Sequence, residues 1–167
     1  DETQSIFTGE YDSWVGKSVV SVDQFSPESL SLLFEVADRM RCFGPGAADG
    51  QRYRGSPPLT GCVLGTLFYE SSTRTACSFQ SAVLRLGGTF MNVGASTSSI
   101  KKGESLEDTV ACLLSYCDAL ALRHPQKGAA LRAAGVASRP VINAGDGVGE
   151  HPTQALLDLY TIQAEVG

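Results

Sequence analysis

The stretch LTGCVLGTLFYESSTRTACSFQSAVLRL, residues 59–86, changes its character partway along, at Tyr69. Residues 59–68 form an apolar run with the length of a buried strand, and residues 75–86 repeat apolar side chains at helical spacing. Hydroxyl side chains and Arg74 lie between the two segments. A strand that leads directly into a helix is the unit from which parallel α/β sheets are built.

The same strand-then-helix order recurs three more times along the chain. The expected strands are residues 89–93, 119–122 and 141–143, and the helices that follow them are residues 105–116, 127–134 and 152–164. Strands that are apolar on both faces need helices above and below the sheet, and crossover helices supply that cover. The sequence therefore predicts an α/β fold, a three-layer domain with a central parallel sheet flanked by helices.

The N-terminal third of the chain is less regular. Residues 1–16 show no clear period and are expected to form an arm, and residues 17–22 are a short β-rich run. A helix is expected next, with Ser26 as its N-cap, Pro27 in its first turn and apolar side chains at positions 30, 33, 34 and 37. Residues 44–58 are rich in glycine and proline and indicate a loop. We expect residues 17–167 to form one domain.

The composition of the chain disfavours several classes of function. The 167 residues are 43% hydrophobic and 19% charged, with a net charge of −5, which indicates a globular domain with a sizeable core. An acidic balance disfavours nucleic-acid and anionic membrane surfaces, so a bound phosphate would belong to a small molecule. No apolar run reaches the roughly 20 residues of a membrane span, and the N-terminal residues are acidic, unlike a transit peptide.

Five scattered cysteines without a C-x-x-C pair are typical of a reducing compartment, and we interpret them as packing residues. Together with the absence of a targeting pattern, they predict a cytoplasmic protein.

Ligands of parallel α/β sheets bind at the carboxyl ends of the strands. The first such end carries Ser72, Thr73, Arg74 and Thr75 at a helix start, where unpaired backbone N–H groups attract an oxyanion. The same four residues also suit an ordinary helix cap followed by an exposed arginine. This segment alone leaves both interpretations open.

Two further strand ends carry candidate groups. Arg123 is the first polar residue after the expected third strand, and it suits either a ligand or a surface ion pair. His151 precedes Pro152 at the expected start of the last helix, where positive charge is disfavoured. A neutral imidazole there can donate to a carbonyl, although a capping role is equally open, and the Gln154 amide suits a carboxamide-like group.

Other chemistries are disfavoured by spacing. Asp146 and Glu150 form a carboxylate pair, but no second histidine accompanies them, so no metal site is predicted. Gly16-Lys17-Ser18 lacks the earlier glycine of a P-loop, and the glycines at 145, 147 and 149 do not follow G-x-G-x-x-G. No G-x-S-x-G elbow or covalent nucleophile is evident.

Four blocks of this sequence resemble the carbamoyl-phosphate domain of the aspartate carbamoyltransferase family. The blocks are Phe-Tyr-Glu-x-Ser-Thr-Arg-Thr (68–75), Ser-Ser-x-x-Lys-Gly-Glu-Ser (98–105), Arg-His-Pro-Gln (123–126) and Gly-Asp-Gly-x-x-x-His-Pro-Thr-Gln-Ala-Leu-Leu-Asp (145–158). The likeness looks closest to the eukaryotic multifunctional pyrimidine-pathway proteins. It implies transfer of the carbamoyl group of carbamoyl phosphate to L-aspartate, without a cofactor.

The resemblance also implies roles for particular residues. The expected carbamoyl-phosphate ligands are Ser72, Thr73, Arg74, Thr75, Ser98, Lys102, Arg123, His151 and Gln154, and the expected catalytic residues are Arg74, Thr75, Lys102, Arg123 and His151. In the family, the loop that carries Ser98 and Lys102 enters the site of a neighbouring subunit, which implies a homotrimer with shared active sites.

The resemblance further implies a second, aspartate-binding domain that these 167 residues do not include, so we expect a fragment that cannot turn over alone. Two alternatives remain at this point: an ornithine-type carbamoyltransferase domain, and a non-catalytic module that binds carbamoyl phosphate.

Overall fold

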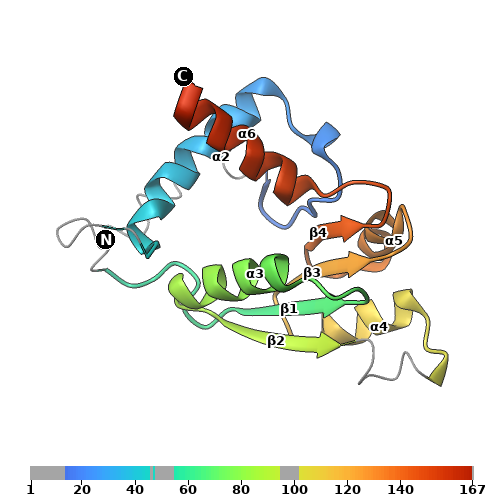
Figure 1. Ribbon diagram of the computed structural model, residues 1–167. Coiled ribbons are helices and arrows are strands. Elements are labelled where there is room, and N and C mark those ends of the chain that lie inside the picture. The colour runs from blue at the N-terminus through green and yellow to red at the C-terminus, as the bar shows by residue number, and fades with distance from the viewer. Residues whose placement is uncertain (1–13, 46, 48–54, 95–101, 167) are drawn as a thin grey trace.

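The computed structural model describes residues 14–45, 47, 55–94 and 102–166. Four parallel strands form one sheet in the order β2-β1-β3-β4. The strands are β1 (Val63–Phe68), β2 (Thr89–Gly94), β3 (Ala119–His124) and β4 (Val141–Asp146), and the helices are α2 (Pro27–Met40), α3 (Thr73–Arg85), α4 (Leu106–Leu113), α5 (Ala129–Val136) and α6 (Pro152–Val166). Helices cover both faces of the sheet, so the predicted three-layer α/β fold is confirmed (Figure 1).

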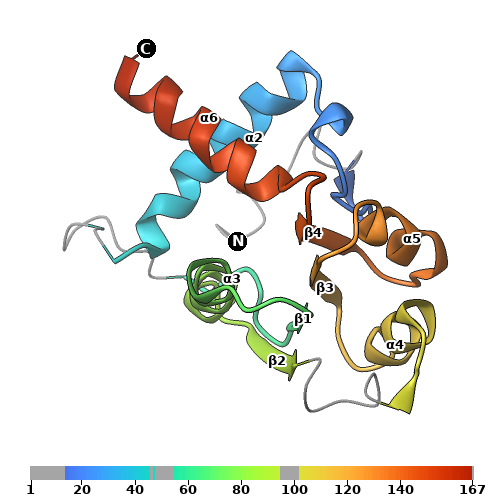
Figure 2. The ribbon, with the colours of Figure 1, turned by 45° about the vertical axis from the view of Figure 1, so that its right-hand side comes forward.

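Successive side chains of β3 point to opposite faces of the sheet. Leu120 and Leu122 are fully buried in the core cluster formed with α4 and α5, which includes Val110 and Ala129. Ala121 and Arg123 occupy the alternate positions and point to the other face. That face carries α3, with α2 and α6 beyond the β4 edge (Figure 2). Arg123 is therefore directed between α3 and α6, and its neighbour His124 is directed toward α4.

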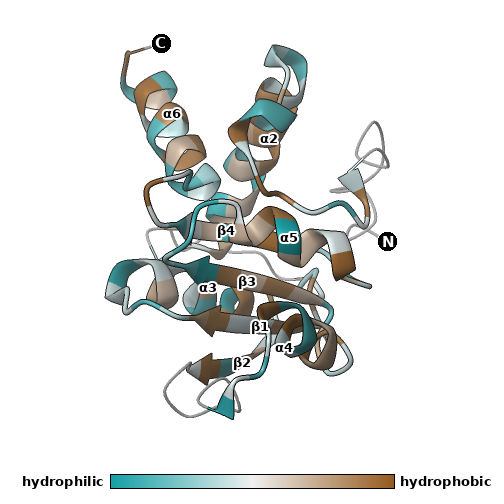
Figure 3. Ribbon diagram, turned by 90° about the vertical axis from the view of Figure 1, so that its right-hand side faces the viewer, coloured by the Kyte–Doolittle hydropathy of each residue, from teal (hydrophilic) through white to brown (hydrophobic). Residues whose placement is uncertain are grey.

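The helices α2 and α6 project beyond the sheet, with mixed polar and apolar surfaces (Figure 3). The Phe34 and Tyr160 rings meet edge to face with centroids 5.5 Å apart, and the Tyr160 hydroxyl donates to Asp38. The α2 start agrees with the sequence, since Ser26 is the N-cap and accepts from the Ser29 N–H. Among the helices of the described residues, none combines the length and the apolar character that crossing a membrane requires.

The β-rich run at residues 17–22 does not become a strand. Only Val19 pairs with the sheet, as a single parallel bridge to Ile142. The N–H groups of Val20 and Ser21 both donate to the Gln24 side chain, at 2.7 and 3.0 Å, instead of extending the ladder. A side chain three or four residues ahead thus ends the pairing, because a backbone N–H that is already bonded cannot join a sheet.

Two strands are longer than the sequence suggests, and this matters for the site. β3 continues through Arg123 to His124, and β4 continues through Asp146. Arg123 and Asp146 therefore stand on strands and not on loops. Side chains on regular elements have less freedom than side chains on loops, so both groups are held in defined positions.

The interpretation of the cysteines as packing residues holds for only part of the set. Cys117 is buried, whereas Cys77 and Cys112 are exposed and Cys42 and Cys62 are half-buried. For Cys77 and Cys112 the interpretation is wrong, because each lies on the outer side of its helix. All five are free thiols.

Candidate functional site

A cavity of about 750 Å³ opens at the carboxyl edge of the sheet, between the first turns of α3 and α6. Both helices begin there because each directly follows a parallel strand. Six of the nine expected ligands line this cavity: Ser72, Arg74, Thr75, Arg123, His151 and Gln154. Residues that lie up to 82 positions apart in the sequence thus share one concave surface.

The other three expected ligands stand apart from it. Thr73 is exposed on the first turn of α3, and Lys102 is exposed just before α4; neither lines the cavity. Ser98 lies outside the described residues. The structure therefore brings together the groups from the first, third and fourth strand ends.

Arg123 is mostly buried and lies against the last strand of the sheet. Its Nη1 donates to the Ala144 carbonyl at 3.0 Å, and its Nε lies 3.8 Å from Glu70 Oε2. The Nε group is buried and has no hydrogen-bond partner within the described parts of the chain. Since leaving a buried donor unpaired is costly, this fixed cation retains unused capacity to bind an acceptor.

A β-bulge in β4 makes room for the guanidinium. Leu122 pairs with Asn143, but His124 pairs with Asp146, so β4 contains one extra residue opposite Arg123. Gly145 within the bulge has φ +115°, and a Cβ atom there would lie 2.5 Å from Arg123 Nη1. Only glycine satisfies both conditions, which explains why a glycine follows Ala144 at this strand end.

His151 stands immediately before Pro152, the first residue of α6, as the sequence predicts. Its Nδ1 accepts the backbone N–H of Gln154 at 3.4 Å. Because a backbone N–H can only donate, a neutral ring carries its proton on Nε2. Nε2 lies 3.4 Å from Thr75 Oγ1, at the cavity. His151 thus caps the helix through one nitrogen and offers a donor through the other.

The charge state of His151 agrees with this role. Burial, and after it the neighbouring charge of Arg123, holds the pKa of His151 below its ordinary value. The sequence suggested neutrality from the helix N-terminus alone, and the structure adds these two causes. A neutral imidazole beside a fixed guanidinium can donate to an oxygen without adding a second positive charge.

The first turn of α3 is comparatively free of internal bonds. Ser72 is the N-cap in extended conformation, but its side chain makes no capping bond. The structure shows no partner for the Arg74 side chain within the described residues. The unpaired N–H groups of the helix start and these side chains are therefore available to an anion.

Gln154 is oriented by the next turn of its own helix. Its Nε2 donates to Asp158 Oδ1 at 2.9 Å, which leaves the amide oxygen as the free acceptor. Asp158 and Gly145 belong to the block 145–158, but neither residue was assigned a role from the sequence; a carboxylate four residues after a site glutamine is the signal for the role of Asp158. The role of Gly145 was missed because it depends on the bulge opposite Arg123.

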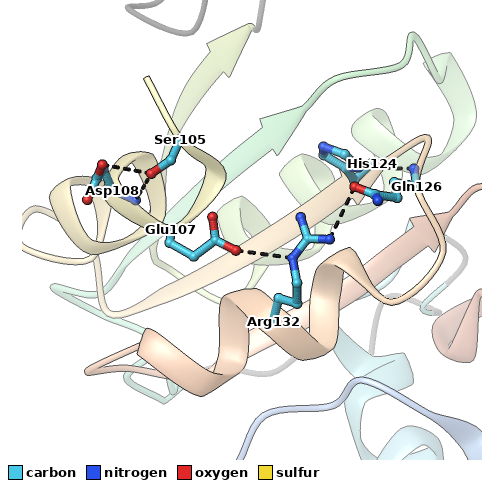
Figure 4. Close-up of polar contacts among 6 residues, drawn as sticks. All are labelled: Ser105, Glu107, Asp108, His124, Gln126 and Arg132. Carbon is cyan, nitrogen blue, oxygen red and sulfur yellow. Dashed lines mark hydrogen bonds and ion pairs between the residues drawn. The ribbon is translucent and has the colours of Figure 1, made fainter. Parts of the chain in front are cut away.

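A polar network ties the loop after β3 to α4 (Figure 4). Arg132 Nε donates to Glu107 at 3.1 Å, and its Nη1 donates to the Gln126 side chain at 3.1 Å. The Gln126 N–H in turn donates to His124 Nδ1 at 3.0 Å. His124 also packs on the Tyr69 ring, 4.4 Å away, so it serves structure on the face opposite Arg123. Within the described residues, no group of three metal-ligating side chains occurs.

Comparison with known proteins agrees with this arrangement. Residues 17–164 match the family described as aspartate/ornithine carbamoyltransferase, carbamoyl-P binding domain. The chain is 50% identical over its whole length to multifunctional protein pyr1-3 of Dictyostelium discoideum, of which it covers 7%. It is 47% identical, over 92% of its length, to the aspartate carbamoyltransferase catalytic subunit of Thermococcus kodakarensis, of which it covers 48%.

Solved structures show the same relation. Aspartate transcarbamoylase from Trypanosoma cruzi, in complex with carbamoyl aspartate and phosphate, superposes with a TM-score of 0.82 at 44% identity. The match covers 92% of this chain and 47% of that one, so the chain spans about half the length of these single-enzyme relatives. The chain belongs to the aspartate/ornithine carbamoyltransferase family, whose carbamoyl-P binding domain it contains.

Proposed function

We propose that this chain is the carbamoyl-phosphate-binding part of an aspartate carbamoyltransferase. The complete enzyme transfers the carbamoyl group of carbamoyl phosphate to the amine of L-aspartate and yields N-carbamoyl-L-aspartate and phosphate, a step of pyrimidine biosynthesis. The observation that carries the proposal is the meeting of Thr75, Arg123 and His151 in one cavity with the open helix start at Ser72.

The phosphate end of the substrate binds at the start of α3. Ser72 and Thr75 supply hydroxyl groups from the cavity lining, and Arg74 supplies a guanidinium that pairs with two phosphate oxygens. Thr73 belongs to the same first turn of α3, although its side chain does not line the cavity. The backbone N–H groups of the first turn point to the same place. Because these donors have few internal partners, binding the anion does not first require breaking protein contacts.

The carbamoyl end lies toward the sheet. Thr75, Arg123 and the Nε2–H of His151 donate to the carbonyl oxygen, and the Gln154 amide oxygen accepts from the carbamoyl NH₂. When the aspartate amine attacks the carbonyl carbon, negative charge grows on that oxygen and then on the departing phosphate. Donors already in place stabilise both changes, and one such donor contributes about 3 kcal/mol to lowering the barrier.

The rest of the enzyme completes this half-site. Residues 17–167 form the carbamoyl-phosphate domain after an arm at 1–16, and a second domain outside this chain binds aspartate. Ser98 and Lys102 serve the cavity of an adjacent subunit in a homotrimer, a proposal supported by the fact that Lys102 does not line the cavity of its own chain. The protein is cytoplasmic, needs no cofactor, and is part of a multifunctional pyrimidine-pathway protein.

Calorimetric titration with fresh carbamoyl phosphate tests the proposal, with the sedimentation mass measured in the same buffer. We expect saturable binding to this chain. Absence of binding by an intact trimer would contradict the assignment of Ser72 to Thr75 as phosphate ligands. Absence of binding by a monomer would mean that the site requires the neighbouring loop or the second domain, and the titration is then repeated on the complete enzyme.

Two further measurements separate the alternatives. The complete enzyme is assayed with L-aspartate and with L-ornithine, because the family includes both specificities; turnover with ornithine alone would contradict the choice of aspartate. Chains carrying Lys102→Ala and Arg74→Ala are then mixed, and activity in the hybrids is expected only if adjacent subunits share a site. A complete enzyme that binds carbamoyl phosphate without turnover would favour a non-catalytic module.

A further inference from the structure

The segment that leads to His151 is rich in glycine. Gly145, Gly147 and Gly149 occur within the six residues before His151, and the first two have positive φ angles. Glycine has the largest backbone freedom of any residue, so a loop of this composition loses much entropy when it is ordered. Contacts from elsewhere must hold it if the imidazole is to keep one position.

The carboxylate of Asp146 supplies the first of these contacts. Asp146 is only 6% exposed, and its two oxygens accept from two different loops. Oδ1 accepts the Glu150 N–H at 2.6 Å, and Oδ2 accepts the Gly128 N–H, in the turn before α5, at 2.7 Å. A Cβ atom at Gly149 would lie 2.3 Å from Oδ1, so the glycine is what allows the loop to close on the carboxylate.

Glu150 supplies the second contact, to the N-terminal segment. Its Oε1 accepts the Ser21 hydroxyl at 3.0 Å, and its Oε2 accepts the Val22 N–H at 2.9 Å. The residues are 129 and 128 positions apart in the sequence. We call the contacts among Asp146, Glu150, Gly128, Ser21 and Val22 the loop brace.

We propose that Asp146 and Glu150 are positioning residues for carbamoyl transfer, which act by holding His151 Nε2 toward the cavity. The inference rests on the proposed function. Neither carboxylate lines the cavity, so neither contacts the substrate. Together they nevertheless tie the segment directly before His151 to the turn at Gly128 and to the N-terminal segment at Ser21 and Val22. A shift of about 1 Å in a catalytic group can lower the rate about 100-fold, so loss of the brace has a measurable consequence.

Asp146→Asn is the first test, because it keeps the volume and removes one acceptor. The asparagine amide NH₂ then faces one of the two backbone N–H donors and cannot bond to it. In the complete enzyme we expect kcat to fall between about 10-fold and 100-fold, while KM for carbamoyl phosphate changes less than about threefold, since the phosphate ligands stand on α3. Equal losses in kcat and stability with unchanged His151 geometry would overturn the proposal.

The geometry of His151 is followed by ¹⁵N NMR of its ring. The chain has two histidines, so the His151 signals need to be told apart only from those of His124. We expect Asp146→Asn to change the Nδ1 and Nε2 signals of His151; His124 is not a fixed reference, because it pairs with Asp146 across the sheet and the charge of Asp146 acts on its pKa. This readout needs neither substrate nor turnover, so it tests the brace even if the wild-type protein fails to bind carbamoyl phosphate and the proposed function is rejected.

A control stands at the amino edge of the sheet. Asp118 Oδ2 accepts the Val63 N–H at 2.9 Å, a bond of the same kind as those of Asp146, although Asp118 is more exposed and also pairs with Arg139. Asp118→Asn is expected to leave the His151 signals and kcat unchanged. If it changes them as much as Asp146→Asn does, the effect is general destabilisation and the proposal fails.

Two variants at the Ser21–Glu150 contact test the same proposal if Asp146→Asn does not fold. Glu150→Ala and Ser21→Ala each remove one partner of the Ser21–Glu150 contact, and Ser21→Thr keeps the hydroxyl. We expect the first two to lower kcat a few-fold, non-additively when combined, and Ser21→Thr to retain the rate. Full activity and unchanged His151 signals in Glu150→Ala would contradict a role for Glu150.

Discussion

The loop between β4 and α6 and the start of α3 stand on two sides of one cavity, yet they are built in opposite ways. In the first, the carboxylates of Asp146 and Glu150 are occupied by bonds to other segments. In the second, Ser72 makes no capping bond, and Arg74 has no partner within the described residues. The His151 ring, which must point in one direction, is held in place by hydrogen bonds within the protein. The donors at the start of α3 have few such bonds and are therefore free to bind an anion.

The two regions differ because ordering them has different free-energy costs. Ordering the glycine-rich loop costs conformational entropy, and internal hydrogen bonds offset that cost before any substrate arrives. Donors at a helix start are exposed to water, which can bond to them, so it costs little free energy to leave them without a partner in the protein. The ligand can then replace the water as their partner. The comparison predicts that the two regions respond differently to substitution.

Arg74→Ala should have the largest effect on binding. Removing a guanidinium that pairs with phosphate costs about 3–5 kcal/mol, so we expect affinity for carbamoyl phosphate to fall about 100-fold or more. The free energy of unfolding should change little, because the Arg74 side chain has no partner within the described parts of the chain. Calorimetric titration and urea unfolding measure the two quantities.

Arg85→Ala is the control on the same helix, at its other end. Arg85 Nε donates to the Ser81 hydroxyl at 3.2 Å, and Arg85 does not line the cavity. The affinity of the Arg85→Ala variant for carbamoyl phosphate should equal that of the wild type. Equal affinity in Arg74→Ala as well would show that the α3 start is not the phosphate site.

His151→Asn separates capping from catalysis. Asparagine is a good N-cap and can replace Nδ1 as the acceptor at the α6 start, but it does not reach Thr75. We expect the transfer rate of the complete enzyme to fall about 100-fold, and the free energy of unfolding to change by less than about 1 kcal/mol. A large loss of stability with normal kcat would mean that the histidine is only a cap.

Gly145→Ala tests the bulge that seats Arg123. The added Cβ meets Nη1 at 2.5 Å and strains a backbone with φ +115°, so we expect a loss of about 2–4 kcal/mol in unfolding free energy. Gly135→Ala is the matched control, because nothing lies within 4 Å of its Cβ and its backbone is helical. That variant should be slightly stabilised, by about 0.5–1 kcal/mol. Equal stability of both variants in denaturant would refute a packing constraint at Gly145.

Of the expected effects, the change of unfolding free energy on acidification should be the smallest. Burial lowers the pKa of His151 and of His124, with the charges of Arg123 and Arg132 as the second causes. The folded state therefore binds fewer protons than the unfolded state, and the stability present above the unfolded pKa of about 6.5 is lost as pH falls. Urea unfolding at about pH 7.5 and 5.5, where carboxylates remain charged, should show lower stability at the lower pH.

A variant with both histidines replaced, His124→Gln and His151→Asn, should flatten this dependence. If stability instead rises on acidification, the lowered pKa values are incompatible with the measurement.

Much of the fold was predictable from particular segments. The four apolar runs, each followed by helical spacing, predicted the parallel sheet because local period and burial agree there. Prediction failed at residues 17–22, where Gln24 takes the N–H groups that a strand needs. It also placed Arg123 in a loop, because the end of a strand depends on its neighbours and not on its own composition.

For the candidate site, the residue types at the strand ends were visible in the sequence, and so was the family. The sequence by itself determined which segments form strands and helices and which polar groups stand at their carboxyl ends, since both follow from local period and residue chemistry. Only the tertiary structure decided that β4 bulges around Arg123, that His151 Nε2 faces the cavity, and that Asp146 and Glu150 hold the loop. Those features depend on contacts between segments up to 129 residues apart, and no local pattern encodes such distances.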